Sequence, residues 1–577
     1  MGILKSRKKF FIIAGVLLAS VGIFIATKLL WNLDAREFYF MAESKNFKRY
    51  SHWINDHYTS FMEKQTPFID NAFKRRIEVT ANVESDGKPF GLKDAGRLFD
   101  LVKKSKLVVD TKHQPADSTA ISEASLLVEK VPFMDAQLFT KAGVLYFTVP
   151  VILPDKYFSL KLDKIDEVYD KFSIPIKPKR FVNATDIAKT VEFDKIALDN
   201  SVENLSSVFS SLITKDAVKY GQERELSISG SVVKGKEVLV SLDSESATAL
   251  LGELAEFIST DNTFLEYTYG NFADLSAMFD DAGLFHLFEF LDETGTIVLN
   301  ENEKNFVSKI NVRKDMEGFR KTLKEALSGY ALKDGLNMAL VIDKEGNILD
   351  RVLTLNLTAP EEDKSFKLDI NTGSSSTEFE DCRNRFAKVI VDNTDTHSGK
   401  TVELQVRPVF SKTNDTDVKG NIAISYSITA QDGMKSGTDI NLDISSQMDD
   451  LTLRRNNIVK YRVDMDSEVG DGSIDGEINS ITWENKKLNT ANSSTKISVQ
   501  ANLPSFGIKD LSAVVNLAGE DRFRIEPFTL PEVQQSAVVD LNAATEKDLD
   551  RIGMELIASF GTFYLENKSV FDVILGQ

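Results

Sequence analysis

Few residues of this sequence have the type and spacing that a catalytic or metal site requires. The five histidines show no spacing typical of metal ligands. Residues 464–475 resemble a calcium loop in their carboxylates, but the sixth position is Val469 and the twelfth is Asp475, where glycine and glutamate are expected. A hairpin turn explains this stretch better. The sequence contains no nucleophile motif, phosphate-binding loop or dinucleotide fingerprint. We therefore expect no enzyme, no metal and no cofactor.

The densest apolar cluster spans residues 277–291 and is the strongest candidate for a binding cavity. Helices that are apolar on nearly every side are either buried in a core or line an apolar pocket. Gly283 is expected to divide the cluster into two short helices. Plain hydrophobic core and the wall of an acyl-chain cavity both remain open interpretations. The candidate lipid-binding residues are Met278, Phe279, Leu284, Phe285, Leu287, Phe288, Phe290 and Leu291.

The N-terminus predicts a single-pass membrane anchor. Residues 10–31 are uncharged apart from Lys28 and mostly apolar, and as a helix they are long enough to cross a bilayer. Four lysine and arginine residues lie in positions 1–9, and such positive charge tends to stay in the cytoplasm. Large residues follow the apolar segment, which argues against a cleaved signal peptide. We expect a cytoplasmic tail over 1–9 and the bulk of the chain outside the cytoplasm.

The composition limits the partners and the compartment. The 577 residues carry a net charge of −18, which argues against binding nucleic acid, because phosphates require a basic surface. The single cysteine, Cys382, excludes an intrachain disulfide. A disulfide-free exported protein of this size fits the surface of a Gram-positive bacterium better than an animal ectodomain.

An amphipathic helical stalk is expected over residues 32–75. Its apolar stripe consists of Phe47, Tyr50, Ile54, Tyr58 and Phe61, at three-to-four-residue spacing. The stripe packs on the next domain or lies at the membrane surface, where aromatic residues are favoured. The candidate membrane-interface residues are Trp31, Phe47, Tyr50 and Trp53.

The remaining chain predicts two lobes and a terminal helix. Strand and helix patterns mix over 76–358, where residues 226–233 are expected to form one strand. Apolar residues then alternate with polar ones in successive segments over 359–540, which predicts an antiparallel meander with one wet face. A helix over 541–577 is expected to pack on the sheet. The predicted fold class is α+β: a transmembrane helix, then two lobes of curved antiparallel sheet with helices in the concave face.

Two resemblances refine this prediction. Residues 33–43, directly after the anchor, and the 538–569 tail with its Asp540-Leu-Asn pattern resemble an uncharacterised family of membrane-anchored Gram-positive surface proteins. More loosely, the strands around Tyr146 and Tyr157 and the turn at 343–347 resemble lipoprotein-carrier domains of the LolA/LppX type. That second resemblance implies a lipid held between a curved sheet and helices.

From these patterns we expect a non-enzymatic protein tethered to the outer face of the cell membrane. It would bind a lipid or a lipoprotein acyl chain between sheet and helices. The alternative is a cell-envelope interaction or sensor protein that binds a protein or a wall polymer. The expected partners are the membrane, a lipid or lipoprotein ligand and an envelope protein, with no nucleic acid.

Overall fold

The structure is a computed structural model. It describes residues 34–85, 95–115, 119–154, 156–172, 190, 195–285, 304, 314–359, 364–379, 382–393, 400–412, 417–430, 433–449, 452, 454–466, 471–485, 487–504 and 508–575. Ten helices and five single-turn helical segments are found among these residues. Over the same ranges, twenty strands pair into one sheet.

Strands are found along most of the sequence. The first ten are β1 Phe73–Glu84, β2 Ser105–Gln114, β3 Thr119–Val128, β4 Val131–Lys141, β5 Val144–Thr148, β6 Tyr157–Lys161, β7 Val218–Ile228, β8 Ser231–Leu242, β9 Ala331–Ile342 and β10 Ile348–Ala359. The second ten are β11 Lys364–Ser374, β12 Arg385–Asn393, β13 Thr401–Lys412, β14 Val418–Thr429, β15 Lys435–Asp449, β16 Arg454–Asp466, β17 Gly472–Asn485, β18 Thr490–Leu503, β19 Ile508–Phe523 and β20 Val538–Asp540.

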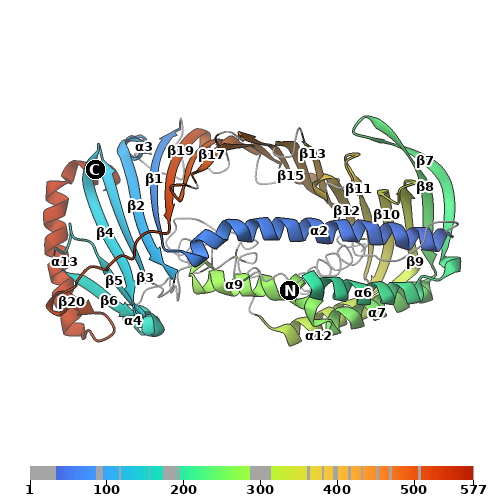
Figure 1. The fold of residues 1–577 in the computed structure, drawn as a ribbon, viewed down its shortest axis with the longest axis horizontal. Coiled ribbons are helices and arrows are strands. Elements are labelled where there is room, and N and C mark those ends of the chain that lie inside the picture. The colour runs from blue at the N-terminus through green and yellow to red at the C-terminus, as the bar shows by residue number, and fades with distance from the viewer. Residues whose placement is uncertain are drawn as a thin grey trace.

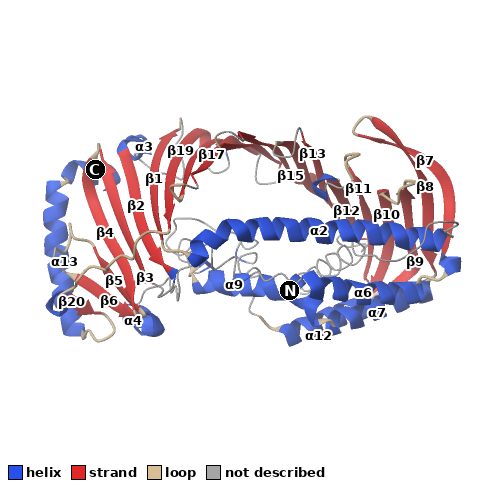
Figure 2. Cartoon of the chain, viewed as in Figure 1, coloured by secondary structure: helices blue, strands red, loops and turns tan. Residues whose placement is uncertain are grey.

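The sheet consists of two meanders joined by a single long-range pairing. Strands β7 to β19 pair in chain order, each antiparallel to the next. Strands β1 to β6 do the same. Pairing of β1 with β19, from Phe73↔Phe523 to Glu84↔Ser512, makes them one sheet. The short β20 adds to β6 in parallel. The result is an elongated arch with β7 at one end and β20 at the other (Figures 1 and 2).

Alternating residues determine the register of the longest meander. Ile444, Val459, Ile478 and Ile497 lie opposite one another on β15 to β18 and therefore share one face. A shift by one residue would turn this row to the other face, so the alternation fixes the pairing. Residues 226–233, expected as one strand, instead contain the β7–β8 turn. Ser229 and Gly230 have φ values of 49° and 77° there, as a tight hairpin requires.

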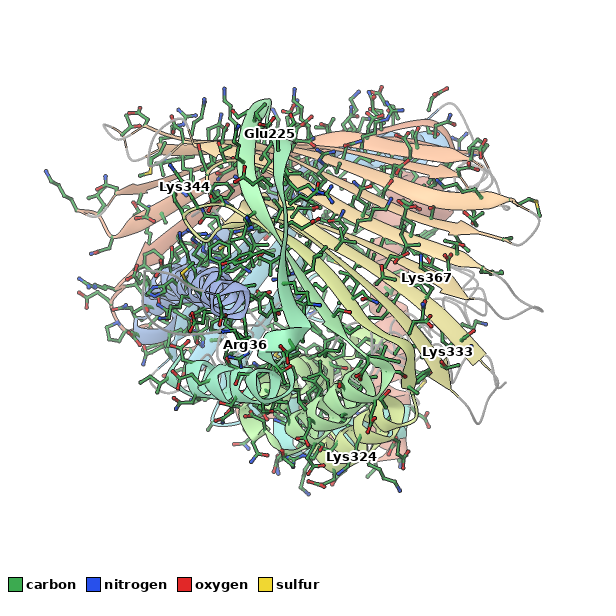
Figure 3. All side chains as sticks on the ribbon, turned by 90° about the vertical axis from the view of Figure 1, so that its right-hand side faces the viewer. Arg36, Glu225, Lys324, Lys333, Lys344 and Lys367 are labelled. Carbon is green, nitrogen blue, oxygen red and sulfur yellow. The ribbon has the colours of Figure 1, made fainter. Side chains whose placement is uncertain are left out.

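The helices lie mainly on one side of the β7–β12 end of the sheet (Figure 3). The described helices are α2 Ala35–Asp70, α3 Ala95–Lys104, α4 Ile165–Phe172, α6 Lys195–Leu212, α7 Ser244–Thr260, α8 Asn262–Leu265, α9 Asn271–Asp281, α12 Met316–Ser328, α13 Glu546–Glu566 and α14 Lys568–Leu575. Of these, α3, α4 and α13 lie at the opposite, β1–β6 end of the sheet (Figure 1). The single turns are η3 Leu162–Lys164, η4 Lys215–Ala217, η5 Glu266–Gly270, η6 Cys382–Asn384 and η8 Gln535–Ala537. The main core joins α2, α6 and α7 to strands β8 to β11, with Tyr39, Leu205, Ile258 and Leu340 at or near zero exposure.

The predicted fold class was wrong. The described strands form one continuous 20-stranded sheet, where two α+β lobes were expected. The expected boundary at residue 358 falls at the end of β10, which is hydrogen-bonded to its neighbour β11. The pattern of residues within one strand does not show which other strands pair with it. It therefore could not reveal that the sheet continues across the expected boundary. None of the described helices is long and apolar enough to cross a membrane, and the anchor predicted over 10–31 lies outside the described residues.

Candidate functional site

The long helix α2 positions the candidate site. Asp34 caps its first turn: the Asp34 carboxylate accepts from the Glu37 backbone N–H, and the Glu37 carboxylate accepts from the Asp34 N–H. The first half of the helix is held in the core by Tyr39, Ala42 and Phe47, each at most 8% exposed. With 36 residues the helix is about 54 Å long. It therefore extends beneath the sheet well beyond its buried half (Figure 1).

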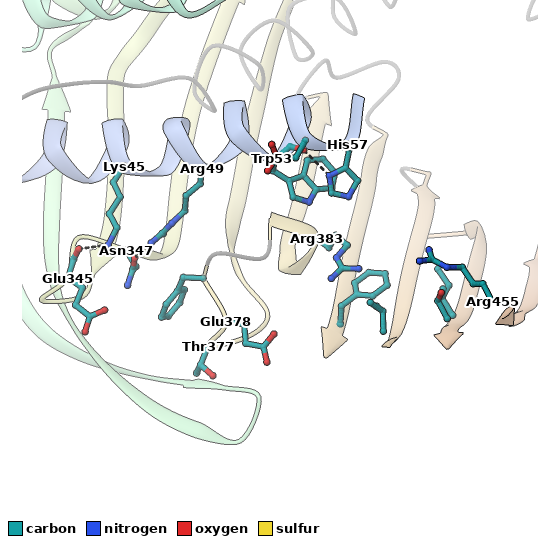
Figure 4. Close-up of a pocket in the computed structure, with 16 residues that line it drawn as sticks. Lys45, Arg49, Trp53, His57, Glu345, Asn347, Thr377, Glu378, Arg383 and Arg455 are labelled. Atoms are coloured by element: carbon teal, nitrogen blue, oxygen red, sulfur yellow. Dashed lines mark hydrogen bonds between the residues drawn. The ribbon is translucent and has the colours of Figure 1, made fainter. Parts of the chain in front are cut away.

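The turn between β9 and β10 reaches up to α2. Asp343 Oδ1 accepts from the backbone N–H groups of Glu345 and Asn347, which closes the turn. Lys45 Nζ donates to the Glu345 carbonyl over 2.7 Å, and Arg49 Nη2 donates to Asn347 Oδ1 over 2.8 Å. These contacts aim two basic side chains of α2 at the same turn (Figure 4).

A second basic group comes from η6, the short turn before β12. Asn384 is fully buried and fixes this turn: its Nδ2 donates to the Phe410 carbonyl, and its Oδ1 accepts from the Phe410 N–H. Arg383 then lies with its guanidinium 5.2 Å from the centre of the Phe410 ring. Arg455 follows from β16 and donates to Met448 Sδ over 3.5 Å.

These side chains face one pocket, which we call the basic pocket. Its volume is about 940 Å³, and it is open to solvent between α2 and the strands (Figure 4). Four cations line it together with His57, three carboxylates, three neutral polar groups and five apolar or aromatic side chains. The lining residues are Lys45, Arg49, Arg383, Arg455, His57, Asp56, Glu345, Glu378, Asn347, Thr377, Ser446, Trp53, Phe379, Phe410, Val418 and Ile444.

A buried layer of charge lies behind the basic pocket. Glu43 of α2 and Arg351 of β10 form an ion pair with side chains only 1% and 4% exposed. Burial raises the pKa of Glu43 to about 7, although Arg351 opposes the rise. Arg385 is close enough to Arg49 and Arg351 to be affected by their charges: burial is the main cause that lowers its pKa, and the two guanidiniums lower it further. Three guanidiniums thus share a low-dielectric layer with Glu43.

Four of the residues predicted to line a lipid cavity lie within the described ranges, and none of these four lines the basic pocket. Met278 and Phe285 are buried, Phe279 is half-buried, and Leu284 is 41% exposed. Leu287, Phe288, Phe290 and Leu291 lie outside the described residues. Three of the predicted membrane-interface residues lie between the helix and the sheet. Phe47 is buried, Tyr50 is half-buried and Trp53 lines the basic pocket. Trp31 lies outside the described residues.

Comparison with known proteins gives weak structural likenesses only. No family model and no curated protein matches the chain. Among solved structures, the outer-membrane expressed OmpT of Vibrio cholerae is 7% identical, with 78% of this chain and 97% of that chain covered and a TM-score of 0.17. An anion-selective porin from Comamonas acidovorans is 8% identical, with 78% and 98% covered and a TM-score of 0.19. The outer membrane protein opdK from Pseudomonas aeruginosa is 7% identical, with 78% and 99% covered and a TM-score of 0.15. At such scores the likeness assigns no activity to this chain.

These findings correct the predicted function, partners and location. The prediction of a single-pass, helix-anchored, lipid-binding protein on a Gram-positive surface was wrong. Within the described ranges, no helix combines the length and the apolar character that a membrane span requires. The basic pocket is lined by charged, polar and aromatic side chains and by none of the described members of the predicted apolar cluster. The physical reason for the error is that a run of apolar side chains does not reveal which of its faces is already packed.

The basic residues of the pocket were not predicted from the sequence. Lys45 and Arg49 lie four residues apart, on the same stretch of helix as Phe47 and Tyr50. Two basic residues on one helix face could have indicated a site for an anion. Charged residues on an amphipathic helix, however, more often face the solvent. Arg383 and Arg455 lie more than 300 residues further on, and only the pairing of strands brings them to α2.

Proposed function

We propose that this protein binds, without transforming it, an anionic ligand that carries an aromatic or aliphatic portion. The ligand would occupy the basic pocket. The observation that carries the proposal is the convergence of four basic side chains, from three separate elements, on a space of about 940 Å³ that also contains Trp53, Phe379 and Phe410. Ligand pockets typically combine apolar walls with a few polar groups that orient the ligand, and this volume is at the upper end of their range.

Electrostatics favours an anion at this place. The chain as a whole carries a charge of −18, yet the lining has four cations against three carboxylates, a local excess of one with His57 neutral. Arg385 adds positive charge close to Arg49, whereas the charge of Arg351 is offset by its ion pair with Glu43. Low-dielectric walls focus such a potential into a cleft. Arginine presents paired donors that suit carboxylate and phosphate groups.

The three carboxylates of the lining narrow the choice of ligand. Asp56, Glu345 and Glu378 would repel a polyanion, so a single acidic group is the better fit. They also accept hydrogen bonds from hydroxyl or amide donors of a ligand. The aromatic side chains offer a flat surface for rings or short aliphatic chains.

The test compares two probes that differ by one charge. Naphthalene-1-acetate and neutral naphthalene-1-acetamide are titrated by calorimetry into the full chain in a mild detergent. The proposal expects the acid to bind at least tenfold more tightly than the amide, because a hydrogen bond to a charged group contributes about 1.5–3 kcal/mol. Raising the salt concentration should weaken binding of the acid more than that of the amide.

Matched variants locate the binding. The double variant Arg383→Gln/Arg455→Gln should lose most of the preference for the acid. Lys460→Gln is the control, because Lys460 is on the same strand as Arg455, faces the other side of the sheet and has a side chain that is 64% exposed. Equal affinity for acid and amide, or equal loss of acid binding in the control and the double variant, would contradict the proposal.

A further inference from the structure

We propose that two copies of this chain associate through α13, in an antiparallel arrangement related by a twofold axis. Helix α13 lies at the β20 end of the molecule, away from the basic pocket (Figure 1). Its outer face exposes Met554 by 67%, Ile557 by 75% and Leu565 by 71%. Single exposed apolar residues are ordinary on protein surfaces. Three on one face of one helix form a patch of the kind that marks an interaction surface.

The two faces of α13 are both apolar, but only one is covered. Ile552 and Phe563 are buried toward the body of the molecule, where the rings of Phe133 and Phe563 lie 5.2 Å apart. The N-terminal end of the helix is capped by Thr545 and Asp548. On the opposite face, Met554, Ala558, Gly561 and Leu565 follow a four-three-four spacing. This is the spacing of a helix that packs along its length against a second helix.

The order of side-chain sizes in this outer row fits a second copy of itself. Read in either direction the row is large, small, small, large. An antiparallel copy therefore places Met554 opposite Leu565 of the second copy, and Ala558 opposite its Gly561. The small residues at the centre allow close approach, and a Cβ atom added at Gly561 would meet no heavy atom within 4 Å. A twofold axis makes such a contact closed, so association ends at the dimer.

Charges at the two ends of the row agree with the antiparallel direction. Arg551 precedes the row and Glu566 follows it. On a helical projection both lie on the same flank of the row. Antiparallel pairing brings Arg551 of each copy near Glu566 of the other, whereas parallel pairing would keep these two residues at opposite ends of the contact. The helix dipoles also oppose one another favourably in the antiparallel arrangement.

The area available predicts a dimer of modest strength. Burial of one large apolar side chain corresponds to roughly 60–120 Å² at ~25 cal/mol/Å². The exposed side chains of Met554, Ile557 and Leu565, with half-exposed Phe560 beside them, thus supply on the order of 250–500 Å² per copy. Specific interfaces begin near 1,000 Å² in total. The contact reaches that size only with its flanks included, so we expect association at micromolar rather than nanomolar concentration.

The first test is sedimentation velocity of the full chain in a density-matched detergent over a range of concentrations. The wild type should pass from monomer to dimer, and Leu565→Glu should raise the dissociation constant at least tenfold. Leu488→Glu is the matched control, because Leu488 is 68% exposed on the β17–β18 turn, and it should leave the dimer unchanged. A wild type that remains monomeric up to 100 µM overturns the proposal. So does a monomer that instead binds lipid vesicles through the same residues.

A second test examines the direction of pairing. Arg551→Glu and Glu566→Arg should each weaken the dimer, and the double reversal should restore it. Copies with Ala558→Cys mixed with copies with Gly561→Cys should cross-link faster than either variant alone, since the native Cys382 is buried. Fastest cross-linking within each single variant would indicate parallel helices and overturn the arrangement.

Discussion

Replacing Glu43 with glutamine should change how the stability of the protein depends on pH. Burial raises the pKa of Glu43 from 4.5 to about 7 in the folded state. Between these two values the folded protein holds a proton that the unfolded chain has lost, so the free energy of unfolding falls as the pH rises. Each unit of pKa is worth 1.36 kcal/mol. This one carboxyl group therefore makes the protein about 3 kcal/mol more stable below pH 4.5 than above pH 7.

The assay is urea unfolding at pH 5 and pH 8, at constant ionic strength, followed by circular dichroism. Glutamine cannot titrate, so the free energy of unfolding of Glu43→Gln relative to wild type should rise by roughly 2–3 kcal/mol between pH 5 and pH 8. The ion pair with Arg351 forms only when Glu43 loses its proton, so its effect is already contained in the pKa of Glu43, and a glutamine, which carries no charge at either pH, adds no pH dependence of its own. Glu477→Gln is the control, since the Glu477 side chain is 39% exposed and its variant should show no such change. A Glu43→Gln difference that is the same at both pH values would refute the reasoning.

Three further variants test the packing and the positioning of the site. Leu340→Ala, at a fully buried position of β9, should lower the free energy of unfolding by about 2–5 kcal/mol, whereas Val232→Ala, 68% exposed, should change it by less than about 0.5 kcal/mol in the same urea assay. Thr545→Ala removes the capping oxygen of α13 and should cost about 1 kcal/mol, measured by thermal unfolding. Asn384→Ala removes both hydrogen bonds to Phe410 and should reduce the affinity for naphthalene-1-acetate measured by calorimetry. An unchanged affinity in Asn384→Ala would contradict this role of Asn384.

Short-range patterns in the sequence predicted much of the long meander. Val402, Leu404 and Val406 lie on β13, and Ile440, Leu442 and Ile444 on β15, with the two-residue period that the sequence shows. Strands β16 and β17, which flank residues 467–470, pair antiparallel with each other, as the predicted hairpin requires. A strand reveals its period because every second residue meets the same environment.

What the sequence could not predict depends on contacts between distant segments. Nothing within β1 or β19 indicates that Phe73 pairs with Phe523. The same holds for the basic pocket, whose cations come from positions 45, 49, 383 and 455. The sequence likewise left open whether the Phe-rich stretch after Met278 is plain core or the wall of a cavity. Apolar composition measures how much surface must be buried, but it does not say whether protein or ligand does the burying.

The pairing of β1 with β19 cannot form until the ribosome has synthesised nearly the whole chain. Ribosomes add about 5–20 residues per second, so β1 emerges roughly 20–90 s before its second neighbour exists. During that interval β1 can pair with β2, but its other edge offers unpaired N–H and C=O groups to any passing strand. Lys74, Arg75 and Arg76 at the start of β1 place positive charge beside this unpaired strand edge. Charges that flank a strand discourage intermolecular pairing. Arg75 later joins Asp521 of β19 through two hydrogen bonds of 2.7 and 3.2 Å. The Arg75 side chain thus first discourages intermolecular pairing of the free β1 edge and later stabilises the pairing of β1 with β19.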